Sequence, residues 1–194
     1  MNFGELKAAI TAQIGRAPSD LAYTLAQADI AKKVKLLDME TTTTLTASGS
    51  VTLPADFNGV IGVYLDRDPR VPISPATLQT QDRAYRSSGT PCTFAISGAT
   101  MKLMPAPAGS DDLILTYWAK PLLVADEDTN TILDNYPDLY VYGVLTHHAG
   151  LIRDLQAAQA WAQGYEAAIR DAMSNDAVVR MSGGQPGAYV RTAP

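Results

Sequence analysis

Apolar residues recur every three or four positions at the start of the chain, which is the spacing of one face of an α-helix. Leu6 and Ile10 carry this pattern, and Gly15 ends it. Asn2, with Glu5 three residues later, has the form of a capping box. The sequence therefore predicts a short helix here.

A second helix is predicted after Ser19, because serine is a preferred N-cap residue. The apolar stripe of this helix is expected to comprise Leu21, Leu25, Ala28 and Ile30, continued less regularly by Val34 and Leu37.

The pattern changes at TTTTLTASGSVTLP, where consecutive threonines, a glycine and a proline oppose a helix and favour extended chain. Short apolar runs between turn residues then predict a small antiparallel sheet or barrel. Gly98 and Ala99 are expected to form a tight hairpin, and Ser74 with Pro75 to begin a short helix between strands. The predicted strands are residues 50–53, 60–65, 93–97, 100–104 and 113–118.

Helical spacing returns after the acidic segment ADEDTN, which we interpret as a solvated loop. In YPDLYVYGVLTHHAGLIRD, Asn135 or Tyr136 is expected to cap a helix whose first turn holds Pro137, where the missing N–H costs nothing. A longer helix should follow, and the glycine-containing end of the chain, which has no stable period, should form a tail. The apolar face predicted for the longer helix is Leu155, Ala158, Ala162, Tyr165, Ile169 and Met173.

These segments together predict an α+β fold. The N- and C-terminal helices are expected to form a helical bundle with an inserted small antiparallel β region and an extended C-terminal tail. The predicted domains are residues 1–40 and 126–175 for the helices, 41–125 for the β insertion and 176–194 for the tail.

The composition is that of a globular chain, with 194 residues, 46% of them hydrophobic and 18% charged. Fifteen Lys and Arg against twenty Asp and Glu give a net charge of -5 without a basic face, so tight binding to nucleic acid is not expected. The single cysteine, Cys92, is expected to be a buried small hydrophobe. With no apolar leader and no run of about 18 apolar residues, we expect a soluble protein, made in a reducing compartment, that does not bind membranes.

The only two histidines of the chain are adjacent. On a helix, adjacent side chains point about 100° apart, so this pair cannot chelate one metal ion as two histidines spaced four residues apart can. His148 lies in the middle of the predicted apolar face and His147 at its border, and we interpret them as packed, hydrogen-bonded side chains. No HExxH, CxxC or phosphate-binding motif occurs. We therefore predict no catalytic residue, no metal and no cofactor.

Another side of the same helix has little side-chain bulk, because Gly143, Thr146 and Gly150 share it. This strip predicts close helix packing, either within the chain or between chains. The candidate packing or subunit-interface residues are Tyr136, Tyr140, Gly143, His147 and Gly150.

Five stretches, taken in order, resemble the head–tail adaptor (connector) proteins of tailed phages, which attach beneath the portal ring. The stretches are TTTTLTASGSVTLPADF, GTP at residues 89–91, MKLMPAPAG, LILTYWAKP and TNTILDNYPDLYVYGVL.

The resemblance implies a structural protein of the virion neck, made in the host cytoplasm and assembled as a ring, with a dodecamer expected, that extends the DNA channel. Its implied partners are the portal protein, neighbouring copies, tail or neck proteins, and double-stranded DNA that passes without specific binding. Val178, Val179, Tyr189 and Val190 would be apolar anchors of the tail on the portal or a neighbour.

Two alternatives remain open. One is a stopper or tail-completion ring protein. The other is a carbohydrate-binding module or enzyme that uses the β insertion, with Tyr64, Tyr85, Tyr117 and Trp118 as its aromatic side chains, although we interpret these as ordinary strand residues.

Overall fold

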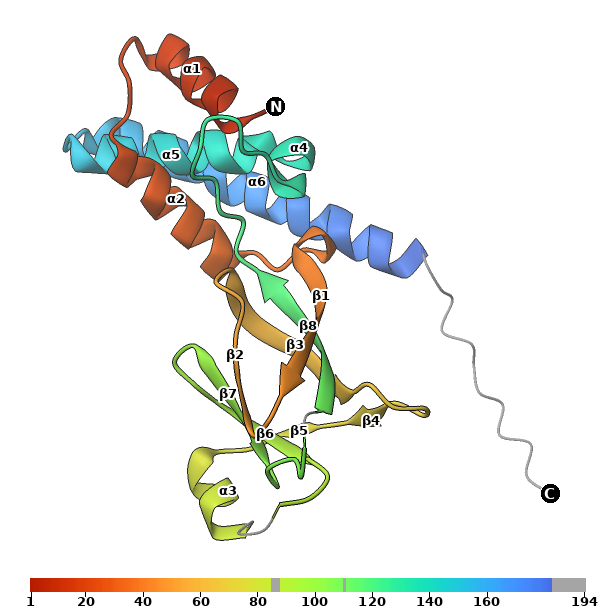
Figure 1. The fold of residues 1–194 in the computed structure, drawn as a ribbon. Coiled ribbons are helices and arrows are strands. Elements are labelled where there is room, and N and C mark those ends of the chain that lie inside the picture. The colour runs from red at the N-terminus through yellow and green to blue at the C-terminus, as the bar shows by residue number, and fades with distance from the viewer. Residues whose placement is uncertain (85–87, 110, 183–194) are drawn as a thin grey trace. The chain divides into compact units, whose positions relative to one another are not determined.

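The computed structural model describes residues 1–84, 88–109 and 111–182 (Figure 1). The helices and strands divide between two compact units. One unit comprises Met1–Met39 with the chain from Pro121 onward, and the other is Glu40–Lys120. Across the described ranges, no helix is long and apolar enough to cross a membrane.

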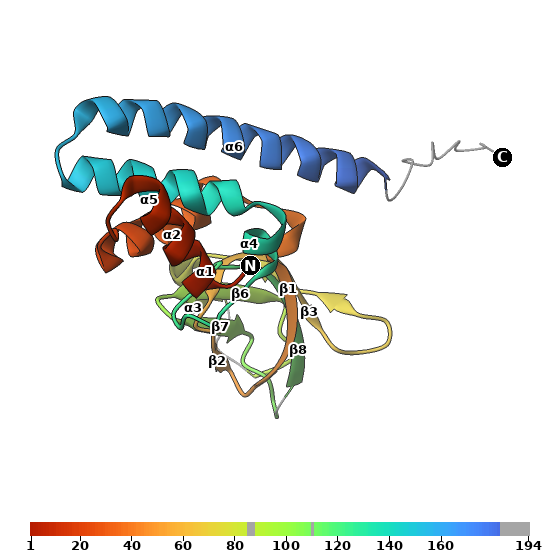
Figure 2. The same cartoon turned by 90° about the horizontal axis from the view of Figure 1, so that it is seen from above.

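The first unit is helical. The helices α5 and α6 lie side by side, and α6 runs on beyond the start of α5 (Figure 2). Helix α2 packs on α5, and the shorter helices lie around this core. The elements are α1 (Phe3–Ile14), α2 (Asp20–Lys33), the 3-10 helix η1 (Leu37–Met39), α4 (Thr131–Asn135), α5 (Pro137–Leu151) and α6 (Leu155–Ser182).

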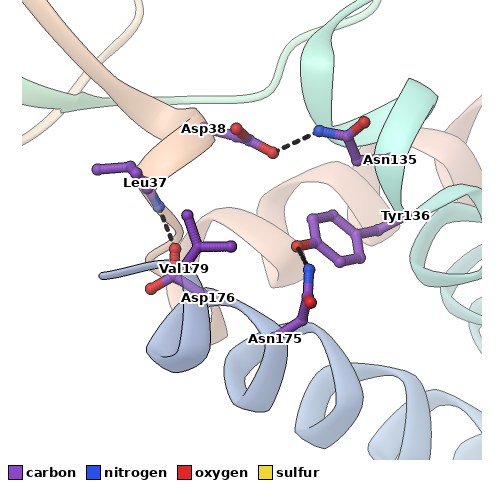
Figure 3. A pocket seen from close by; sticks show the side chains of 7 residues that line it. All are labelled: Leu37, Asp38, Asn135, Tyr136, Asn175, Asp176 and Val179. Atoms are coloured by element: carbon purple, nitrogen blue, oxygen red, sulfur yellow. Dashed lines mark hydrogen bonds between the residues drawn. The ribbon is translucent and has the colours of Figure 1, made fainter. Parts of the chain in front are cut away.

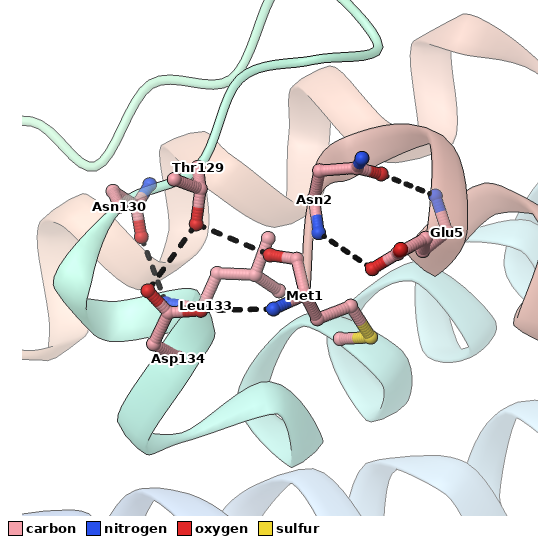
Figure 4. Close-up of polar contacts among 7 residues, drawn as sticks. All are labelled: Met1, Asn2, Glu5, Thr129, Asn130, Leu133 and Asp134. Atoms are coloured by element: carbon pink, nitrogen blue, oxygen red, sulfur yellow. Dashed lines mark hydrogen bonds and ion pairs between the residues drawn. The ribbon is translucent and has the colours of Figure 1, made fainter.

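Helix α1 begins and ends as its sequence predicts. The Asn2 side chain accepts a hydrogen bond from the Glu5 backbone N–H at 2.8 Å, and the Glu5 carboxylate accepts one from the Asn2 N–H at 3.0 Å (Figure 4). Gly15 ends the helix with φ 72°, a conformation that glycine adopts without steric cost. The predicted capping box is confirmed.

The acidic segment before α4 is more ordered than the predicted solvated loop. Its backbone carbonyls at Asp126 and Asp128 accept hydrogen bonds from Gly4 and Phe3, at 2.8 and 2.9 Å. The Asp128 carboxylate accepts two backbone N–H bonds, from Ala125 at the start of the segment and from Val124 just before it, and these bonds lower its pKa. The segment therefore fastens α1 to the helical unit, and Thr129 adds a bond to the Met1 carbonyl (Figure 4).

The second unit contains two sheets with the strand orders β1-β8-β3-β4 and β2-β7-β6-β5. Side chains from both sheets share one hydrophobic core, in which Leu65, Leu113, Met101 and Leu103 are fully buried. The elements are β1 (Glu40–Ala47), β2 (Ser50–Thr52), β3 (Phe57–Leu65), β4 (Val71–Pro72), β5 (Ser74–Pro75), α3 (Leu78–Ala84), β6 (Thr93–Ser97), β7 (Thr100–Met104) and β8 (Asp111–Ala119).

Local turn chemistry predicts part of this unit correctly. The hairpin of β6 and β7 turns at Gly98 and Ala99, as expected, with Ser97 opposite Thr100. A short helix does interrupt the strands, but it is α3 and begins at Leu78, so Ser74 and Pro75 do not begin it. They form β5, which pairs in parallel with β6, and so the sheet is not purely antiparallel.

The predicted helical bundle is wrong. The chain is α+β, with two four-stranded sheets in place of one small sheet. Among the described helices, only α5 and α6 run alongside each other over many turns (Figure 2). The bundle was inferred from apolar stripes, and part of those stripes faces solvent, as Leu21 and Leu155 do with 53% and 73% exposure.

The predicted start of the tail at residue 176 is also wrong, because α6 continues to Ser182 and contains Val178 and Val179. Contacts of Asp176 stabilise these last turns. Its carboxylate accepts a hydrogen bond from the Leu37 N–H of η1 and pairs with Arg180 one turn on. Tyr189 and Val190 lie outside the described residues.

Candidate protein interface

Tyr140 is a structural residue of the helical unit. Its buried hydroxyl donates to the Pro121 carbonyl at 3.0 Å and accepts from the Asn130 amide at 2.9 Å. Asn130 in turn caps α4 by accepting from the Leu133 N–H at 2.8 Å. Burial raises the pKa of Tyr140 above its usual range, so the hydroxyl stays protonated and can donate.

The two glycines of the small-residue strip have different surroundings. Gly143 is buried, and a Cβ there would lie 3.4 Å from Ala26 of α2 and 3.4 Å from the Tyr165 ring of α6. Gly150 is exposed, and a Cβ there would meet no described atom within 4 Å. Gly143 therefore serves packing inside the chain, whereas Gly150 leaves backbone accessible at the surface.

Close packing at Gly143 explains why α2 buries a face other than the predicted one. Small residues, Ala22 and Ala26, face the core together with Ile30. The larger Leu21 and Leu25 point outward, with 53% and 36% exposure. Of the predicted stripe, Ile30 and Val34 are fully buried, whereas Leu21, Leu25, Ala28 and Leu37 are exposed.

His148 is buried and hydrogen-bonded, as predicted, since its Nε2 accepts from the Arg16 Nε at 3.1 Å. Burial and the neighbouring guanidinium lower the pKa of His148. His147 lies at the border of the helix face, and its buried Nε2 has no hydrogen-bond partner among the described residues. That atom lies 3.9 Å from the Asp29 carboxylate, but burial has the larger effect and lowers the pKa of His147.

Tyr136 and Val179, predicted separately as interface residues, line the same pocket (Figure 3). The pocket has a volume of about 330 Å³. The Tyr136 hydroxyl accepts from Asn175 at 2.8 Å, and Asn135 donates to the Asp38 carboxylate at 2.7 Å. We call this the α6-end pocket, and its lining residues are Leu37, Asp38, Asn135, Tyr136, Asn175, Asp176 and Val179.

Helix α6 exposes apolar side chains at both of its ends. Val178 and Met181 are 63% and 79% exposed beside the α6-end pocket. At the other end, Leu155 is 73% exposed, next to Leu151 and Ile152 at 44% and 47%. Exposed apolar groups that gather in this way are typical of protein–protein contact sites.

The aromatic side chains of the β unit do not form one platform in the part of the chain that the structure describes. Tyr117 is buried and donates from its hydroxyl to Asp56 at 3.0 Å. Tyr64 is 38% exposed and Trp118 is half-buried, while Tyr85 lies outside the described residues. Cys92, expected to be buried, is exposed.

Sequence patterns gave no sign of the role of Gln27. Its buried side chain donates to the Leu123 carbonyl at 3.1 Å and accepts from the Leu123 N–H at 2.9 Å. The amide thus satisfies both backbone groups of Leu123, as the backbone of a paired β-strand residue would. A lone glutamine in a helix carries no signal for such a contact. The described residues also contain no group of three metal-ligating side chains.

The exposed apolar side chains at the two ends of α6 are typical of a protein that contacts other proteins. The model of the SU10 adaptor protein family matches residues 1–188. The chain therefore belongs to the SU10 adaptor protein family, and the predicted membership in the phage head–tail adaptor class is confirmed. Comparison with individually curated proteins gives no match.

Proposed function

We propose that this phage adaptor is a structural head–tail adaptor that forms a ring below the portal, extends the DNA channel and provides the docking surface for tail or neck proteins. The observation that supports this function is the family match, which covers nearly the whole chain. On this proposal the protein lies in the neck of the virion, is made in the host cytoplasm and catalyses no reaction.

The surface available for such contacts supports the proposal. Of the predicted interface residues on and just before α5, Gly150 is exposed and Tyr136 and His147 are half-buried, whereas Tyr140 and Gly143 are buried within the chain. Val178 and Val179 are exposed at the end of α6, where they would contact the portal or a neighbouring copy. Tyr189 and Val190 would extend the same contact.

The charge of the chain fits a channel through which DNA slides. Each phosphate that a protein neutralises adds salt-dependent affinity, which would hold the DNA in place. A net charge of -5 does not favour such contacts.

Sedimentation velocity of the protein with the portal ring encoded by the same genome tests this function. We expect co-sedimentation at one adaptor subunit per portal subunit. Attachment to a purified ring of another connector, but not to the portal, would instead identify a stopper or tail-completion protein. Binding to neither ring would overturn the proposal.

A variant truncated after Ser182 tests whether the C-terminal residues contribute to portal binding. It keeps Asp176 and Val179, and with them the contacts that hold the end of α6. We expect it to fold like the full chain and to bind the portal more weakly, because Tyr189 and Val190 are removed. Unchanged binding would exclude these two residues from the contact.

A further inference from the structure

The α6-end pocket lies at the last turns of α6 and is lined partly by apolar surface (Figure 3). Its side chains Leu37 and Val179 are exposed, and Tyr136 is half-buried. Beside the pocket, Val178 and Met181 are more than half exposed. Apolar side chains that gather in this way on a surface are typical of a contact site.

The pocket also presents one open carboxylate, that of Asp38. Asp38 is exposed, accepts a hydrogen bond from the uncharged Asn135 amide at 2.7 Å and forms no ion pair within the described residues. Asp176 differs, because its nearly buried carboxylate already pairs with Arg180. An occupant that complements this pocket therefore brings apolar side chains and a single positive charge near Asp38.

The chain carries a segment of this chemistry directly after α6. Residues 183–194, which lie outside the described residues, have the sequence GGQPGAYVRTAP. Tyr189 and Val190 supply the large side chains, and Arg191 is the only charged side chain of the segment, with no acidic residue after Asp176 to offset it. The family match ends at residue 188 and so assigns nothing to these three residues.

The position and length of the segment bring it within reach of the pocket. Its first two residues are glycines, and glycine directly after a helix is the usual residue at which the chain turns. Tyr189 lies five residues beyond them, and that stretch of chain spans up to about 17 Å. Along α6, Val179 lies about 5 Å and Asn175 about 10 Å before the helix end, at about 1.5 Å per residue. A chain that turns at the glycines therefore reaches the whole of the pocket wall that α6 supplies.

We propose that residues 183–194 of the free chain fold back over the end of α6, with the Tyr189 ring in the α6-end pocket and Arg191 beside the Asp38 carboxylate. A volume of about 330 Å³ is at the lower end for pockets that hold a small ligand, which suits one aromatic ring. The short tether keeps the segment at a local concentration in the millimolar range. The segment thus covers this surface until a partner replaces it.

Cysteine crosslinking in the full chain tests where Tyr189 lies. Tyr189→Cys is combined with Leu37→Cys in a Cys92→Ser background and oxidised in dilute solution. We expect an intramolecular disulfide, seen as a faster-migrating monomer without reductant. Tyr189→Cys with Ser174→Cys is the matched control. Ser174 is exposed and within the same reach, but it lies about 200° around α6 from Asp176 and outside the pocket.

Two outcomes of this crosslinking would overturn the inference. Equal crosslinking of the Leu37 and Ser174 pairs would show that the segment passes near the pocket without occupying it. A disulfide-linked dimer in place of the intramolecular disulfide would put the segment on a second copy of the chain.

A peptide with the sequence of residues 183–194 provides a second readout. In the full-length variant Tyr189→Ala the pocket is left open, so the labelled peptide should bind about tenfold more tightly than to the wild type, whose own segment competes. Adding Asp38→Lys should weaken this binding about threefold, and Arg191→Glu in the peptide should reverse the loss. Fluorescence polarisation measures each affinity. Equal binding of the peptide to the wild type and to Tyr189→Ala, or to neither, would contradict the assignment.

The inference concerns the free chain, and its tests include neither the portal nor a ring. Loss of the crosslink and of peptide binding would leave co-sedimentation with the portal unaffected. Conversely, a chain that ignores the portal would still show the intramolecular disulfide. The two proposals therefore fail separately.

Discussion

The ring of Tyr142 in α5 lies directly against Gly164 in α6, so close that a Cβ on Gly164 would come within 3.1 Å of two ring carbons. The arrangement is reciprocal, because Tyr165 of α6 lies against Gly143 of α5. Each helix thus places an aromatic ring over a glycine of the other. These two contacts between a ring and a glycine set how closely α5 and α6 approach. The absence of a side chain at Gly143 also lets Ala26 of α2 lie close to it.

Gly143→Leu should destabilise the protein by about 1–3 kcal/mol or more, because the added side chain cannot fit between α2 and α6. Gly150→Leu is the matched control on the same helix, and its effect should stay within about 0.5 kcal/mol, since Gly150 faces open space. Urea unfolding of the two variants measures the difference. Equal effects of the two substitutions would contradict the intramolecular role of Gly143.

Tyr140→Phe should lower the free energy of unfolding by about 1–3 kcal/mol, because it removes the donor to the buried Pro121 carbonyl. Tyr136→Phe is the control, since that hydroxyl bonds to an exposed Asn175, and its loss should cost less than about 1 kcal/mol. Thermal unfolding of both variants gives the comparison. A larger effect at Tyr136 would show that the Tyr140 network is not the stabilising one.

Gln27→Met keeps the length of the side chain but leaves the N–H and carbonyl of Leu123 without their partner. Each unsatisfied buried group costs about 1–3 kcal/mol, so a loss of about 2–4 kcal/mol is expected. The same change at Gln159, an exposed position of α6, should be nearly neutral. Denaturant midpoints and their slopes distinguish these outcomes, and a neutral Gln27→Met would refute the stabilising role of the contact.

Stability should fall as the pH drops below about 6.5, the ordinary pKa of histidine. The folded chain lowers the pKa of both His147 and His148, so below that pH the unfolded chain binds more protons and acid favours unfolding. Asp128, whose pKa is lowered from 3.8, acts only in a more acidic range. The double variant His147→Gln, His148→Gln should show a flatter profile between pH 7.5 and 5. An unchanged slope in urea midpoints would assign the dependence to other groups.

Much of the local structure follows from neighbouring residues and is predictable for that reason. The capping box at Asn2 and Glu5 and the hairpin at Gly98 each depend on groups within a few positions. The threonine-rich β1 was predicted only as extended chain, because what makes it a strand is its full pairing with β8, some seventy positions away. Helix α4 was missed, since five residues are too few to show a helical period.

The candidate site was predicted in its parts but not in its arrangement. The small-residue strip indicated close packing, yet only the structure places Gly143 inside the chain and Gly150 at its surface. Tyr136 and Val179 lie 43 positions apart, and nothing in their local sequence indicates that they line one pocket. The end of α6 was predicted as tail, because the contact of Asp176 with Leu37 is invisible to a local pattern.

The sequence by itself determined where helices and hairpins begin, because caps and turns bring together atoms that the chain already holds close. Its resemblance to phage adaptors also identified the class of protein. Tertiary structure alone decided which face of α2 is buried, because small Ala22 and Ala26 permit the approach to Gly143 that Leu21 and Leu25 would block. Which of two apolar faces of a helix becomes buried depends on the shape of segments that are distant in the sequence, and only the packed fold brings those segments together.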